Sequence, residues 1–133
     1  LKVSGSFVAA VDDVFESGTV GDLGVDEGGD GIVPITTTIG DLVSIPVGAG
    51  VTAFLVGADF AADKSSQWEI IVADAGVPVR FIRTGVQSAG NQAHMDFPRA
   101  IEIVGAATRT LKLRAKTTAG NGNAGGGLNI YTR

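Results

Sequence analysis

The chain has 133 residues, of which 44% are apolar and 18% charged, and this composition excludes an intrinsically disordered protein. The length predicts one domain that spans residues 1–133. Cysteine is absent, which excludes disulfides, thiolate metal sites and cysteine nucleophiles. The 20 glycines follow no Gly-X-Y repeat, so they exclude collagen and indicate many tight turns.

Charge is distributed unevenly along the chain. Residues 1–63 hold one basic residue and ten acidic ones, whereas residues 64–133 hold nine basic residues and four acidic ones. Two explanations stay open: opposite charges pair within one chain, or they form complementary patches on neighbouring subunits. The isoelectric point of about 4.8 and the lack of a basic stripe interleaved with aromatics predict that the protein does not bind nucleic acid.

Strands dominate the predicted elements, because glycine and β-branched residues interrupt every window long enough for a helix. In chain order, strands are predicted at Leu1–Ala10, Ile32–Ile39, Leu42–Val47, Val51–Ala61, Gln67–Ala73, Val77–Thr84, Asp96–Val104, Thr108–Thr118 and Leu128–Thr132. A helical turn is possible only at Val11–Gly18, and loops are predicted at Ser17–Gly31 and Ala119–Gly127. Pro34 suits an edge strand. Leu42–Ala58 lacks charge, but its proline and glycines indicate strands and a turn instead of a membrane span.

Eight to nine short strands separated by turn residues predict an all-β fold, an antiparallel β-sandwich or jelly roll. The strand at residues 108–118 has the clearest alternation. Its inward face is expected to carry Leu111, Leu113 and Ala115, and its outward face Lys112, Arg114 and Lys116. The aromatic residues are expected mainly in the core.

The second half of the chain resembles a known family. The resemblance rests on five segments: the strand Phe97–Val104, the turn Gly105–Thr108, the strand at 108–118, a Gly/Asn loop and the terminal Leu128-x-Ile130 strand. Together, over roughly residues 67–133, they resemble the end of C1q/TNF-like jelly rolls, in the version found in bacteriophage virion proteins. The acidic loop at 17–31 departs from that pattern.

The resemblance implies a homotrimer at a virion surface or another extracellular location. It would act without catalysis, as a capsid decoration protein or as a tail-fibre tip that contacts other virion proteins, a host receptor or a glycan. The expected subunit contacts are the basic row Lys112, Arg114 and Lys116 against the acidic residues Asp22, Asp26, Glu27 and Asp30. The basic row could equally be a solvated strand face that discourages aggregation.

The alternative function is a carbohydrate-binding, lectin-like module that uses the acidic loop as a Ca²⁺ site or an exposed aromatic such as Trp68 or Tyr131. A small hydrolase ranks last, because no Gly-x-Ser-x-Gly motif accompanies the single histidine, His94. The spacing of Asp26 and Asp30 is not that of an EF-hand, and the match of residues 120–125 to Gly-x-Gly-x-x-Gly precedes a predicted strand instead of a helix. We therefore expect no catalytic residue, metal or cofactor.

Overall fold

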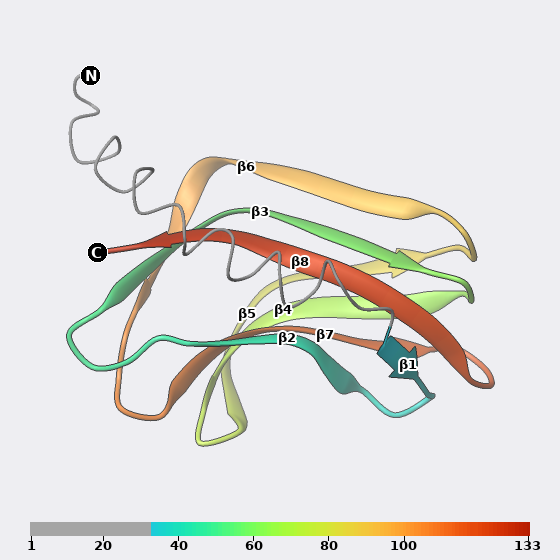
Figure 1. Ribbon diagram of the computed structural model, residues 1–133, viewed down its shortest axis with the longest axis horizontal. Coiled ribbons are helices and arrows are strands. Elements are labelled where there is room, and N and C mark those ends of the chain that lie inside the picture. Colours follow the sequence, from blue (N-terminus) through green and yellow to red (C-terminus); the bar gives the residue numbers. More distant parts are fainter. Residues whose placement is uncertain (1–32) are drawn as a thin grey trace.

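The computed structural model describes residues 33–133, which form eight antiparallel strands and no helix (Figure 1). The strands are β1 (Val33–Ile35), β2 (Gly40–Pro46), β3 (Thr52–Ala62), β4 (Ser66–Asp74), β5 (Val77–Gln87), β6 (Gln92–Val104), β7 (Arg109–Thr117) and β8 (Gly122–Thr132). The all-β prediction is confirmed. The expected strand Leu1–Ala10, the turn at 11–18 and the loop at 17–31 lie outside the described residues.

The strands form two sheets of four. Sheet I has the order β1-β8-β3-β6, and sheet II has the order β2-β7-β4-β5. The pairs β4–β5, β3–β6, β2–β7 and β1–β8 are nested about the β4–β5 turn, like one long hairpin wound into a sandwich. This arrangement is a jelly roll, which confirms the predicted sandwich. Pro34 lies in β1, at the edge of sheet I, where its missing N–H costs no ladder bond.

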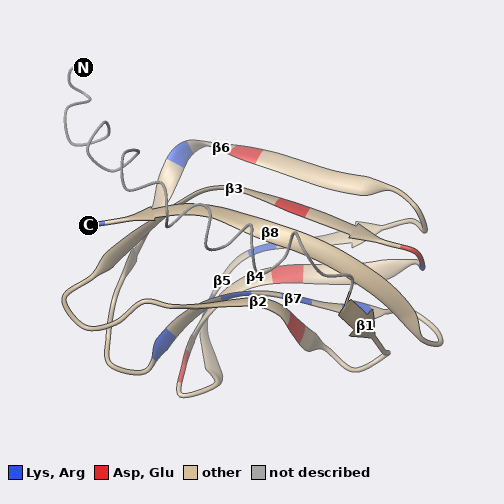
Figure 2. Cartoon of the chain, viewed as in Figure 1, with Lys and Arg blue, Asp and Glu red and all other residues tan. Residues whose placement is uncertain are grey.

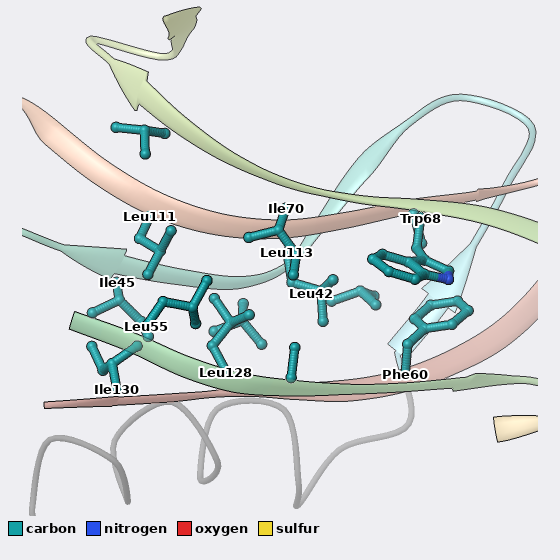
Figure 3. Close-up of a cluster of buried hydrophobic side chains, with 14 of the residues drawn as sticks. Leu42, Ile45, Leu55, Phe60, Trp68, Ile70, Leu111, Leu113, Leu128 and Ile130 are labelled. Carbon is teal, nitrogen blue, oxygen red and sulfur yellow. The ribbon is translucent and has the colours of Figure 1, made fainter. Parts of the chain in front are cut away.

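The core lies between the two sheets and is made by alternate residues of their strands (Figure 3). Leu111 and Leu113 of β7 are fully buried and meet Leu55 of β3 and Leu128 of β8 from the opposite sheet. The expected alternation of β7 is therefore confirmed, and so is the inward position of Leu128. At one end of the core, the rings of Phe60 and Trp68 pack with centroids 6.2 Å apart.

The predicted loop at residues 119–127 is wrong over most of its length, because β8 begins at Gly122. Its glycines pair with β1 and β3 through backbone groups, which need no side chain. A Cβ on Gly126 would lie 2.5 Å from the Asp59 carbonyl oxygen and 2.7 Å from a methyl carbon of Leu113. Close packing between the sheets therefore requires glycine at this position, so a glycine-rich sequence forms a strand here.

Other strand boundaries differ less from the prediction. β1 ends at Ile35, earlier than the expected strand Ile32–Ile39, whereas β6 begins at Gln92 instead of Asp96. Within residues 33–133 no helix is long and apolar enough to cross a membrane.

Candidate functional site

The basic row of β7 lies on the outer face of sheet II, beside acidic residues of its neighbouring strands β2 and β4 (Figure 2). The Lys112 Nζ atom is 2.8 Å from a carboxylate oxygen of Asp41 on β2. Arg114 donates from Nε and Nη2 to one oxygen of Glu69 on β4. Two members of the row therefore have intrachain partners, which supports the first explanation of the charge pattern for these residues.

Lys116 differs from the other two members of the row. Among residues 33–133, no hydrogen bond or ion pair of its ammonium group is found. The acidic residues expected to face the row, Asp22, Asp26, Glu27 and Asp30, lie outside the described residues. Lys116 is therefore the member of the row that the described fold leaves available for a ligand or partner.

A groove lies beside Lys116 on the outer face of sheet II. It has a volume of about 390 Å³ and is lined by residues of β4, β5 and β7, among them Gln67, Glu69, Phe81, Thr84, Arg114 and Lys116. We call it the outer groove. The register aligns these residues: Gln67 lies opposite Lys116, and Glu69 lies between Arg114 and Thr84. Sequence reasoning missed the groove because it depends on which strands are neighbours.

The exposed aromatic residue differs from those expected. Trp68 and Tyr131 are only 5% and 9% exposed, so neither offers a ring to solvent. Phe81, in contrast, is 61% exposed at the outer groove and overturns the expectation that it belongs to the core. The register places Phe81 opposite Ile71, whose side chain is buried on the outer face.

The sandwich is open on the side between its two edge strands, β5 and β6. These strands follow each other in the chain but belong to different sheets and do not pair. Apolar side chains on this open side are exposed or only half-buried: Val77, Val79, Ile82, Met95, Phe97 and Ile101. Arg80 bridges the strands by donating from Nη1 to the Glu102 carbonyl oxygen at 2.9 Å.

At the turn end of the open side, the Arg109 side chain links the two sheets. Arg109 of β7 donates to both carboxylate oxygens of Asp74, at 3.2 and 2.9 Å, and to the Val104 carbonyl oxygen of β6 at 2.7 Å. The hydrogen bond from Arg109 holds the pKa of Asp74 below its usual value. Arg109 therefore fixes the end of the edge strand β6 to the end of β4, next to the apolar residues of the open side.

His94 lies between two carboxylates on the outer face of sheet I. Its Nδ1 contacts Asp59 of β3, the residue opposite it in the register, and its Nε2 is 3.3 Å from an oxygen of Asp96. Because the two carboxylates flank opposite sides of the ring, they do not converge on a shared cation position. Within the described part of the chain, no group of three metal-ligating side chains is found.

The His94 cluster predicts a pH effect. The hydrogen bond to Asp59, followed by the contact with Asp96, raises the pKa of His94 above its usual 6.5. A raised pKa means that this contribution to stability is complete below pH 6.5 and is lost as the pH rises through the folded-state pKa. An NMR titration of the imidazole should show Asp59→Asn lowering the pKa more than Asp96→Asn does. Equal pKa values in all three proteins would contradict this assignment.

The chain matches no protein-family model, no curated protein sequence and no solved structure.

Proposed function

We propose that this protein is a non-enzymatic structural subunit of a bacteriophage virion, a jelly roll that functions as a homotrimer in a capsid decoration or at a tail-fibre tip. The observation that carries the proposal is the open side between β5 and β6, where apolar side chains of both edge strands stand exposed or half-buried. Exposed apolar side chains gathered on one side of a fold are typical of a protein–protein contact. The virion setting comes from the resemblance of the second half of the chain.

The edge strands favour contact through side chains over extension of a sheet. β5 contains Pro78 and two register shifts, and β6 contains Pro98 within a bulge where residues 97–100 oppose Val56 alone. Prolines and bulges on edge strands hinder pairing with a strand of another molecule. Packing of the open sides about a three-fold axis would instead cover Val79, Phe97 and their neighbours with apolar surface, as a closed oligomer requires.

Two aspartate substitutions on the same strand test this proposal. We expect Val79→Asp, on the open side, to reduce the mass measured by light scattering after size exclusion from three times 13.4 kDa to one chain. The reason is that a carboxylate in an apolar subunit contact must lose water without gaining a partner. Val86→Asp is the matched control, because Val86 is also exposed on β5 but lies at the outer groove.

The control should keep the trimeric mass. A monomeric native chain would contradict the proposal, and so would a trimer that Val79→Asp leaves intact while Val86→Asp dissociates it. Circular dichroism of both variants would show whether the fold is retained.

A further inference from the structure

The outer groove presents an exposed aromatic ring beside hydrogen-bonding side chains. Phe81 has no other described ring against it, and its exposed surface borders the groove that Gln67 and Thr84 also line. An aromatic ring of this kind is an apolar platform for the C–H face of a sugar ring. Small-molecule sites commonly combine such apolar surface with a few placed polar groups, and the volume of about 390 Å³ is in their usual range.

Glu69 supplies a fixed acceptor in the groove. Both donated bonds from Arg114 reach its Oε2, and no described group donates to its Oε1. The two side chains are each only 18% exposed, so the pair is held in place by its surroundings. A free carboxylate oxygen repels a simple anion, but it accepts a hydrogen bond from a hydroxyl group. A ligand that presents a hydroxyl group at this position would therefore satisfy the free oxygen.

The charges of the groove favour a ligand with a negatively charged group. Glu69 and Arg114 neutralise each other, whereas Lys116 has no carboxylate partner among the described residues. The groove therefore carries a local positive charge on a chain whose net charge is −4. A lysine ammonium group binds a carboxylate through charge-assisted hydrogen bonds. Gln67 and Thr84 add uncharged side chains that both donate and accept hydrogen bonds, as sugar hydroxyls require.

We propose that the outer groove binds a saccharide that carries a carboxylate group. The C–H face of the sugar packs on Phe81, its hydroxyl groups bond to Glu69 Oε1, Gln67 and Thr84, and its carboxylate pairs with Lys116. A simple carboxylate such as acetate would satisfy Lys116, but it would leave the free oxygen of Glu69 without a donor. The site lies apart from the open side, so it does not depend on the proposed trimer.

Amide NMR spectra of the full chain test this site with three defined probes: short oligomers of galacturonic acid, glucuronic acid and sialic acid. Their methyl esters are the matched probes without charge, and sodium acetate is the anion without a sugar. We expect at least one acidic oligomer to shift the amides of β4, β5 and β7 around the groove, while its ester binds more weakly and acetate leaves those amides unchanged.

Two variants and two controls locate the contacts. Lys116→Gln should weaken binding of the acidic oligomer about tenfold and remove its preference over the ester. Phe81→Leu leaves an apolar side chain over Ile71 but removes the flat ring. It should weaken binding of the acidic oligomer and of its methyl ester alike, by roughly threefold to tenfold. Lys64→Gln and Phe54→Leu make the same changes away from the groove and should bind as the native chain does.

Four results would overturn the proposal. No shift with any of the three acidic oligomers would show that the groove takes no such sugar. Equal binding of acid and ester would remove the carboxylate from the recognition, and equal shifts with acetate would reduce the site to nonspecific anion binding. A loss of binding in Lys64→Gln equal to that in Lys116→Gln would place the contact elsewhere.

Discussion

Replacing Gly105 with alanine is expected to lower the free energy of unfolding by about 3 kcal/mol. Gly105 follows β6 and donates its N–H to the Val51 carbonyl oxygen at 2.7 Å. A Cβ at this position would lie 1.9 Å from the Gly48 carbonyl oxygen and 2.4 Å from that of Val51. Both obstacles are backbone atoms, so no side-chain rotation relieves the overlap, and the two loops must move apart.

The movement would also break the second bond between these loops, from the Ala106 N–H to the Val47 carbonyl oxygen at 3.0 Å. Gly48→Ala is the matched control, because it adds the same methyl group on the other side of this contact, where a Cβ meets no atom within 4 Å. The control should change the free energy of unfolding by no more than about 0.5 kcal/mol. Denaturant unfolding at one fixed protein concentration measures both variants. Equal stabilities would show that the loops separate without cost.

The sequence predicted the fold class because alternation survives wherever one face of a strand is buried. In β7, the buried Leu111, Leu113 and Ala115 alternate with Lys112 and Arg114 in a way that only an extended strand produces. Such a pattern is local, so it can be read without knowing which strands are neighbours. The pairing of β1 with β8 and of β2 with β7 is not local, and it was not predicted. The prediction of a jelly roll depended on counting strands and on a resemblance.

The main error in the predicted secondary structure was the loop at residues 119–127, and it arose from the glycines of this segment. The segment at residues 122–127 carries four glycines, and turn residues of this kind normally indicate a loop. In β8 they allow the opposite strand and sheet to approach closely, as the position of Gly126 against Asp59 shows. This requirement depends on tertiary contacts, so composition alone cannot reveal it.

The candidate site was predicted only in part, for a related reason. The outward position of Lys112 and Arg114 followed from alternation, but their partners Asp41 and Glu69 lie 71 and 45 residues away. The exposure of Phe81 was missed because β5 contains register shifts, which disturb the alternation that would place a residue inside or outside. Exposure at an edge strand depends on what the rest of the fold leaves uncovered.

Trp68 and Gly85 are expected to behave as one unit in the core. Gly85 lies opposite Trp68 in the register, and a Cβ on Gly85 would lie 2.4 to 2.7 Å from three atoms of the indole. Trp68 is 5% exposed and packs on Phe60, so the indole has little room to move away. Gly85→Ala should therefore lower the free energy of unfolding by about 2–3 kcal/mol through overpacking.

A double-mutant cycle separates this overlap from other effects. Trp68→Leu alone should cost about 3 kcal/mol for the cavity that it leaves, reduced by roughly 1 kcal/mol because the buried indole N–H has no hydrogen-bond partner among the described residues. In the double variant the alanine methyl group enters the space of the lost indole. The double variant should therefore lose less free energy of unfolding than the sum of the two single variants, by about 1–3 kcal/mol. Strictly additive costs would mean that Gly85 is required by its backbone and not by the ring beside it.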